Sequence, residues 1–255
     1  MAIIVPNHKL LFIMVPATGC SSIGEILQEK FGGEYIPKKN LYKDKKVLLP
    51  SKHNTIAGLR KYNCLSSNEL SNLLKFGTVR NPFDIFATQY QRFIGEWSDI
   101  SLGLQERKLG KALSKEEEEA IKFSLENRRK TIAKTKEKSF DEWLEDSLSA
   151  IYDKRNNLMY KSKSQLKALI TSHYYPDACP MVSGVDEIIR YESLEKDFNA
   201  ILRKVGSINS NEYIEVPNNN PTQGKKKYCE YYSAYSRNLV EKYLGKDLEA
   251  LGYNF

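Results

Sequence analysis

A short polar loop between an apolar strand and an amphipathic helix constrains the fold of this chain more than any other feature. Residues 11–15 are apolar and rich in β-forming side chains, and Pro16 ends the run. A loop of small and hydroxyl-bearing residues follows, and the apolar spacing of a helix begins at Ile23. Because a helix N-terminus presents unpaired N–H groups and the positive end of the helix dipole, such a turn can hold a phosphate. An ordinary strand-to-helix connection, with Ser21 or Ser22 as the N-cap, explains the same residues.

A second strand-turn-helix unit occurs later in the chain. Residues 75–80 predict a buried strand that ends at Asn81, and Pro82 begins a helix with an apolar face. Two such units separated by helical material indicate a parallel α/β sheet. The same reasoning predicts strands at residues 47–49 and 185–191, helices beginning near Asn54 or Thr55, near Ser66 or Ser67 and after Ser193, and a final helix from Tyr228 to Leu248.

The segment from residue 97 to residue 138 is different, because long charged runs flank a thin apolar stripe. A long solvated helix with (i, i+4) charge pairs explains this pattern, and a lid or acceptor-binding arm is the alternative. An amphipathic helix capped by Ser139 follows and continues to Ile151. Since no linker or internal repeat is found, we expect residues 1–255 to form one domain with a helical insertion at about 97–183.

The charge balance of the 255-residue chain points to an anionic partner. The formal net charge is +7, which fits a nucleotide, an acidic glycan or a nucleic acid. RNA-binding aromatic motifs, helix-turn-helix spacing and zinc-finger patterns are not found, so we expect no nucleic-acid partner.

Three further features bear on location and metal content. The longest apolar run is far shorter than the ~20 residues that cross a bilayer, and residues 1–9 lack the pattern of a signal peptide. We therefore expect a cytoplasmic protein without a membrane span, although a luminal domain cut from its anchor would have the same sequence. The four cysteines and three histidines are scattered without zinc-ligand spacing, so no metal is expected.

Four stretches resemble PAPS-dependent sulfotransferases, specifically the carbohydrate-type branch and its bacterial and viral relatives. PAPS is 3′-phosphoadenosine 5′-phosphosulfate, the sulfuryl donor of that family. The similar stretches occur in the family's order and leave out roughly residues 97–180: they are 16–23, 79–90, 188–198 and the Tyr-rich C-terminal helix with its ending at 251–255. The resemblance implies a three-layer α/β fold like that of P-loop nucleotide hydrolases, with a parallel sheet of about four or five strands flanked by helices.

The resemblance also implies which residues bind the nucleotide. The first loop is similar to the family's 5′-phosphosulfate loop, and it contains Ala17, Thr18, Gly19, Cys20, Ser21 and Ser22. The family binds the 3′-phosphate with an Arg at a strand end and a Ser eight residues later, which here are Arg80 and Thr88. Arg80 would supply a planar fork of N–H donors and Thr88 a hydroxyl. Lys225 and Lys226, after Gly224, either close over the nucleotide or belong to a solvated turn.

His53 is the candidate general base for transfer to an alcohol. It falls where the family's relatives carry a His-x-Thr segment between the two phosphate motifs, and His8 and His173 have no such support. Proton removal from the acceptor hydroxyl is the role this position implies. A surface or capping histidine is the alternative.

Ala17 departs from the family, which has a lysine at this position to neutralise charge on the departing nucleotide. Losing one such contact typically costs on the order of 10²–10³ in rate. The alanine is explained by an introduced inactivating substitution, by a natural loss that leaves a PAPS- or PAP-binding protein, or by replacement with another cation such as Lys52 or Lys225. We expect an introduced or recent change in an otherwise competent enzyme.

The sequence therefore predicts in-line sulfuryl transfer from PAPS to a hydroxyl of a carbohydrate or other small acceptor, with PAP as product. A non-catalytic PAPS-, PAP- or glycan-binding protein of the same fold is the alternative. A P-loop kinase fits less well, because no Gly-Lys-Ser/Thr follows Gly19. Acceptor choice should depend on residues 34–65 and 97–183, where Trp97, Tyr174 and Tyr175 could stack on a sugar or fill the core, and Trp143 is expected in the core.

Overall fold

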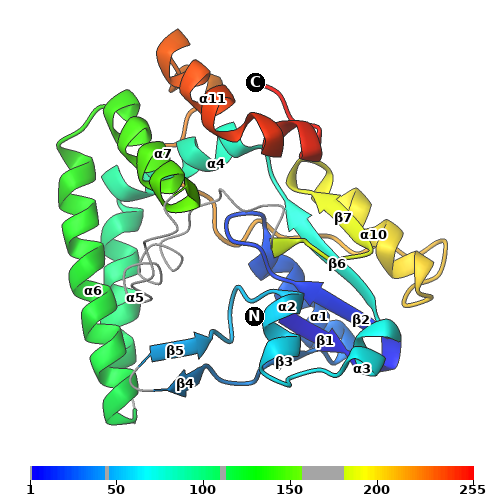
Figure 1. The fold of residues 1–255 in the computed structure, drawn as a ribbon. Coiled ribbons are helices and arrows are strands. Elements are labelled where there is room, and N and C mark those ends of the chain that lie inside the picture. Colours follow the sequence, from blue (N-terminus) through cyan, green and yellow to red (C-terminus); the bar gives the residue numbers. More distant parts are fainter. Residues whose placement is uncertain (1, 44–45, 110–112, 157–180) are drawn as a thin grey trace. The chain divides into compact units, whose positions relative to one another are not determined.

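The computed structural model describes residues 2–43, 46–109, 113–156 and 181–255 (Figure 1). The chain divides into two compact units, the first formed by Met1–Arg80 with Asp177–Asn220 and the second by Asn81–Pro176 with Pro221–Phe255. The expected single domain with an insertion at about 97–183 stays a prediction.

A five-stranded mixed sheet is the centre of the first unit. Its strands, in the order β3-β1-β2-β6-β7, are Glu34–Ile36, Ala2–Val5, Leu10–Ile13, Leu74–Val79 and Glu187–Arg190. β2, β6 and β7 are parallel neighbours, whereas β1 pairs antiparallel with both β2 and β3. The 3₁₀ turn η1 (Pro6–His8) closes the β1–β2 hairpin. The predicted α/β class and strands near 10–15, 75–80 and 185–191 are confirmed, and β1 alone runs against the other strands.

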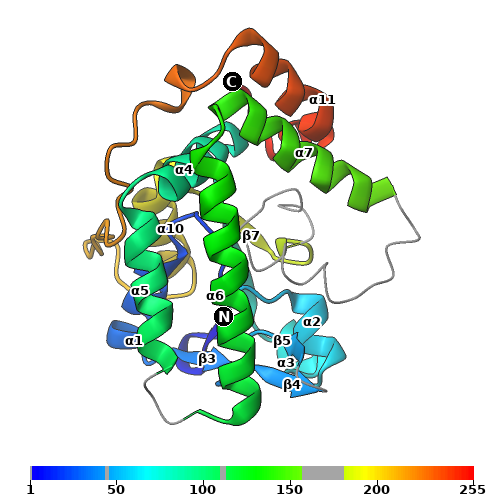
Figure 2. The ribbon, with the colours of Figure 1, turned by 90° about the vertical axis from the view of Figure 1, so that its left-hand side faces the viewer.

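Alternating side chains of β2 pack into two hydrophobic cores, one on each face of this sheet. Leu10 and Phe12, with Met14 just after the strand, pack with α1 (Cys20–Phe31) and α10 (Leu194–Lys204). Leu11 and Ile13 pack with residues of α2 (Ile56–Lys61) and α3 (Ser67–Ser71). Figure 2 shows the two helix pairs on opposite sides of the strands. This arrangement is the predicted three-layer architecture.

Several local predictions for the first unit need correction. β1 and β3 were not predicted, because the first is a short apolar run at the chain start and the second has only three residues. The predicted strand at 47–49 exists as β5 (Lys46–Leu49), but it pairs with β4 (Leu41–Lys43) in a separate two-stranded sheet. The N-cap of α1 is Gly19, not Ser21 or Ser22. The predicted caps Thr55 and Ser66 are confirmed, and each accepts a hydrogen bond from a first-turn N–H.

The second unit is helical within its described residues. It contains α4 (Pro82–Ile94), α5 (Trp97–Leu109), α6 (Lys115–Lys136), α7 (Phe140–Asn156), the 3₁₀ turn η3 (Tyr228–Glu230) and α11 (Ala234–Leu251). Its core gathers apolar residues of α4, α6, α7 and α11, and Trp143 lies in it as predicted. The predicted final helix starts too early, because Tyr228 lies in η3 and Ser233 caps α11. Tyr174, Tyr175 and His173 lie outside the described residues.

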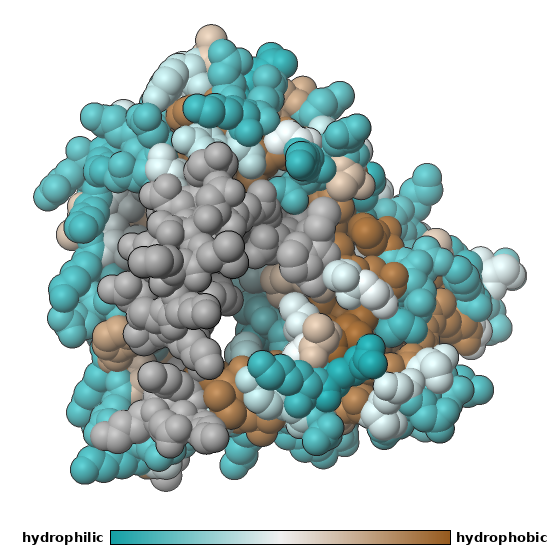
Figure 3. Space-filling model, viewed as in Figure 1, coloured by the Kyte–Doolittle hydropathy of each residue, from teal (hydrophilic) through white to brown (hydrophobic). Residues whose placement is uncertain are grey.

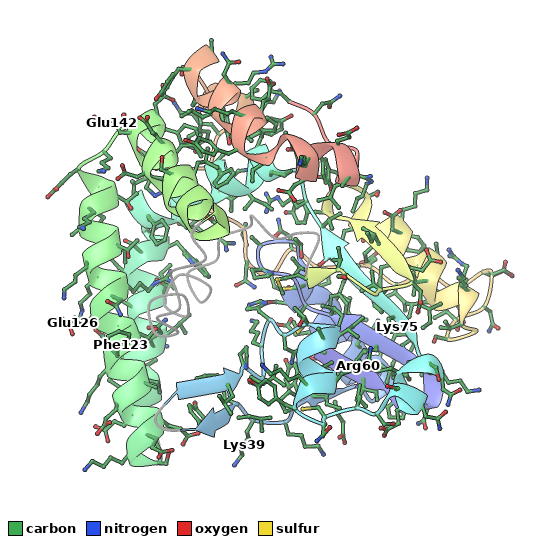
Figure 4. All side chains as sticks on the ribbon, viewed as in Figure 1. Lys39, Arg60, Lys75, Phe123, Glu126 and Glu142 are labelled. Carbon is green, nitrogen blue, oxygen red and sulfur yellow. The ribbon has the colours of Figure 1, made fainter. Side chains whose placement is uncertain are left out.

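The predicted solvated charged helix is confirmed in α6, although α5 is separate from it. Salt bridges one turn apart join Glu118 to Lys122 and Glu126 to Lys130. Figure 4 shows Phe123 and Glu126 projecting from α6, and the Phe123 side chain is 59% exposed. Figure 3 shows mostly hydrophilic residues over α6 and α11. None of the described helices is long and apolar enough to cross a membrane.

Candidate functional site

The loop between β2 and α1 has the backbone geometry of an anion-binding turn. Ala17 has φ 62° and Gly19 has φ 74°, so two left-handed residues alternate through the loop. α1 then begins at Cys20 with neither a side-chain cap nor an acidic residue in its first turn. Successive N–H groups in such a turn point into a concavity, and the helix dipole adds positive potential there. These features are typical of loops in which backbone N–H groups bind an anion.

Gly19 cannot be replaced by a larger residue without moving its neighbours. A Cβ atom at this position would lie 2.5 Å from Cδ2 of Leu194 and 3.4 Å from Cδ2 of Tyr191. Its positive φ adds a second reason, since left-handed backbone is strained for residues with a side chain. The Tyr191 and Leu194 side chains therefore lie close to the loop at Gly19.

Thr18 fastens the loop to the neighbouring strand. Its side chain is fully buried, and its Oγ1 donates to the carbonyl oxygen of Val15 at 2.7 Å. The same hydroxyl is hydrogen-bonded to that of Thr78 in β6, which is also fully buried. The Thr18 side chain is therefore part of the scaffold that holds the loop.

The next three residues of the loop face different surroundings. Burial raises the pKa of the Cys20 thiol, and the positive charge of Lys52 offsets part of this effect. The Cys20 side chain therefore belongs to the core, whereas Ser21 is half-buried. Ser22 is buried but lines a pocket beside the loop.

That pocket lies between the loop, the start of α10 and a later segment of the first unit. It has a volume of about 480 Å³, and its lining includes Gly19, Ser22, Tyr191, Lys196, Tyr213 and Asn218. Hydrogen bonds to α10 fix its outer wall, because Glu195 accepts from the Tyr213 hydroxyl at 2.8 Å and from the Val216 N–H at 2.8 Å. A phosphate held by the loop would lie at one end of this pocket.

Arg80 follows the carboxyl end of β6 and reaches the loop. Its side chain is largely buried, with 6% of the residue surface exposed. Nη1 donates to the carbonyl oxygen of Ala17 at 2.9 Å, and the guanidinium carbon lies 4.0 Å from the centroid of the Tyr191 ring. This hydrogen bond joins the buried Arg80 side chain to the left-handed Ala17 backbone of the loop. The sequence predicts Arg80 as a 3′-phosphate contact, and it does not predict this contact with the loop.

His53 is held beside the same loop by its ring. Its Nδ1 lies 2.9 Å from the carbonyl oxygen of Met14, the residue that follows β2. A carbonyl can only accept, so Nδ1 carries the proton in this hydrogen bond. The backbone of His53 is left-handed, with φ 60°, and Lys52 before it is exposed.

The other predicted nucleotide contacts lie in the second unit. Thr88 in α4 is 1% exposed, and its Oγ1 has no hydrogen-bond partner among the described residues. Lys225 forms a salt bridge with Asp84, and Lys226 is exposed. Their contacts with a nucleotide stay predictions from the sequence.

Sequence reasoning did not select two residues of this site. Tyr191 lies in the motif at 188–198, which assigns it no role. Its position beside Arg80 depends on the parallel pairing of Val79 with Arg190. Thr78 lies in an apolar strand, where its partner Thr18 is 60 residues away in sequence. A threonine inside a buried strand is the only local signal of such a pair.

Comparison with known proteins identifies one family. The model of the sulfotransferase family matches residues 1–254. No curated protein and no solved structure gives a significant match to the chain. Among the described residues, no group of three or more His, Cys, Asp and Glu side chains could hold a metal ion.

Proposed function

Since this chain belongs to the sulfotransferase family, we propose that it transfers a sulfuryl group from PAPS to a hydroxyl of a carbohydrate or another small acceptor. The single observation that carries this proposal is the loop itself, in which the backbone donors of an uncapped helix start lie beside the guanidinium of Arg80. The donor is strongly anionic, and this arrangement offers it positive potential from backbone and side chain together.

The residues present fit such a nucleotide. The left-handed Ala17 and Gly19 shape a cradle for the 5′-phosphosulfate, and a side chain on Gly19 would fill the space beside it. Arg80 has the planar fork that suits a 3′-phosphate. Thr88 stays the second 3′-phosphate contact that the sequence predicts.

The chemistry assigns His53 the role of general base. PAPS supplies an activated sulfuryl group; its transfer forms a bond from the acceptor oxygen to sulfur, breaks the bond from sulfur to the 5′-phosphate oxygen, and releases PAP. Nε2 of His53 takes the proton of the acceptor hydroxyl, while Nδ1 keeps its own proton on the Met14 carbonyl. That hydrogen bond fixes the ring orientation, which a base needs.

The charge that Ala17 does not supply can come from Lys52. Of the two lysines considered, Lys225 is engaged with Asp84, whereas Lys52 is exposed and its charge reaches Cys20 at the start of α1. An ammonium near the helix start would stabilise negative charge on the departing nucleotide. Lys52 is therefore the better candidate to replace the missing lysine.

A transfer assay with labelled PAPS and a panel of carbohydrate acceptors tests the proposal. We expect sulfate transfer by the Ala17→Lys variant, and a rate on the order of 10²-fold lower from the chain with Ala17. Equal rates from the two proteins would show that Ala17 does not impair transfer. We expect Lys52→Ala to lower the residual rate about tenfold, with the exposed Lys61→Ala as its control.

The second candidate function is a non-catalytic PAPS- or PAP-binding protein, which Ala17 favours because the loop lacks its usual cation. Binding of 3′,5′-ADP without sulfate transfer by either protein would support this alternative and overturn the enzymatic proposal. A P-loop kinase fits less well, since the loop has no Gly-Lys-Ser/Thr.

A further inference from the structure

The register of two parallel strands places Arg80 beside Tyr191. β6 and β7 pair with Val79 opposite Arg190, so the next residue of each strand leaves the sheet at the same edge. Ligands of α/β proteins bind at the carboxyl ends of parallel strands. Both side chains therefore start from the edge at which the β2–α1 loop also begins.

The guanidinium of Arg80 lies over the ring of Tyr191. The guanidinium carbon of Arg80 lies 4.0 Å from the centroid of the Tyr191 ring, and Nη1 of Arg80 donates to the Ala17 carbonyl oxygen at 2.9 Å. A stacked guanidinium keeps its N–H donors in its own plane, directed away from the ring. The ring thus restricts the movement of Arg80 on one side.

Tyr191 itself is held by the turn that leads into α10. Asp197 accepts hydrogen bonds from the Arg190 N–H at 3.1 Å and from the Ser193 hydroxyl at 2.6 Å, on both sides of Tyr191 in sequence. The ring also lies close to Gly19, because a Cβ added there would be 3.4 Å from it. The backbone on both sides of Tyr191 is therefore held, and Arg80 lies over the ring.

We propose that Tyr191 is a positioning residue that orients Arg80 toward the 3′-phosphate of the nucleotide. This inference rests on the proposed function, in which Arg80 binds that phosphate. Holding a long side chain in one rotamer before binding removes part of the entropy cost of forming a bidentate contact. The ring acts through Arg80, and its removal therefore weakens recognition of the 3′-phosphate more than recognition of the rest of the nucleotide.

Calorimetry with two nucleotides tests this role. The probes are 3′,5′-ADP and 5′-AMP, which differ only in the 3′-phosphate, and the proteins are the unmodified chain, Tyr191→Leu and Tyr191→Phe. We expect Tyr191→Leu to weaken the binding of 3′,5′-ADP about tenfold and that of 5′-AMP less than twofold. Tyr191→Phe should keep the original ratio of the two dissociation constants, because its ring still stacks. In Arg80→Lys, which cannot stack a planar fork, adding Tyr191→Leu should have little further effect on the ratio.

A matched control is Tyr62→Leu. The Tyr62 ring also contacts a cation, the Lys61 ammonium, but it packs against the core on the other face of the sheet. We expect its nucleotide ratio to equal that of the unmodified chain. An equal loss of both nucleotides in Tyr191→Leu, or an unchanged ratio, would overturn the positioning role while leaving the proposed function intact. An unmodified chain that does not prefer 3′,5′-ADP would overturn both.

Discussion

Nδ1 of His53 and the carbonyl oxygen of Met14 lie 2.9 Å apart, and this hydrogen bond connects the candidate base to the strand that leads into the loop. Met14 is almost completely buried, so its carbonyl is a fixed acceptor. A histidine held in this way has a defined tautomer and ring plane before any substrate binds.

Replacing His53 should affect transfer without affecting nucleotide binding. We expect His53→Gln to lower kcat by about 10²–10⁴, since a positioned base contributes roughly that factor. Calorimetry of 3′,5′-ADP should give the same Kd as before the substitution. The control is His8→Gln, whose histidine contacts Ser207 and Phe31 away from the loop; comparable losses in both variants would argue against a catalytic role for His53.

The buried pair Thr18 and Thr78 should show unequal effects on stability. Thr18→Val removes both bonds of the Thr18 hydroxyl and leaves the Thr78 hydroxyl buried, which we expect to cost about 1–3 kcal/mol of unfolding free energy. Thr78→Val leaves the Thr18 bond to the Val15 carbonyl intact and should cost less. Urea unfolding measures both, and a larger loss from Thr78→Val would contradict this assignment of the hydrogen bonds.

Ala17 is in a backbone conformation that favours glycine. With φ 62°, it carries a strain of about 1–2 kcal/mol that glycine lacks, and the extra entropy of glycine in the unfolded chain offsets about 0.4–1 kcal/mol of that gain. We therefore expect Ala17→Gly to raise the free energy of unfolding by about 0.5–1 kcal/mol. Ala17→Lys keeps the same strain, and its stability should stay close to that of the unmodified chain. A loss of stability in Ala17→Gly would mean that this strain is absent.

Alkylation should separate the two kinds of cysteine. Burial raises the pKa of Cys20, which leaves less thiolate at pH 8, whereas Cys229 is an exposed free thiol. Iodoacetamide followed by peptide mass spectrometry should therefore label Cys229 first and Cys20 only after unfolding. Equally fast labelling of Cys20 in the folded protein would contradict the burial of its side chain in the core.

The sequence predicted those parts of the fold that have a strong local pattern. The apolar run 11–15, the strand before Asn81 and the helix after Pro82 all have spacing and punctuation that identify them without tertiary information. No local pattern predicts β3, or the pairing of β5 with β4. Both depend on contacts between distant or very short segments. Gly19 as the cap of α1 was missed because the serines after it are the stronger capping residues by type.

The residues of the candidate site were predicted from motifs, but the contacts between them were not. Arg80 and His53 could be named from their places in the motifs. The hydrogen bond from Arg80 to the Ala17 carbonyl joins residues far apart in sequence, so it depends on the folded conformation of the loop. The stacking of Arg80 on Tyr191 depends on strand register, and register is a property of the sheet as a whole.

Calorimetry of the unmodified chain with 3′,5′-ADP and with ATP tests whether the loop, together with Arg80, binds a 3′-phosphorylated adenine nucleotide. We expect saturable 1:1 binding of 3′,5′-ADP, with ATP at least tenfold weaker because it has no 3′-phosphate for Arg80. ATP binding as tight as or tighter than that of 3′,5′-ADP, or no binding of 3′,5′-ADP, would contradict it.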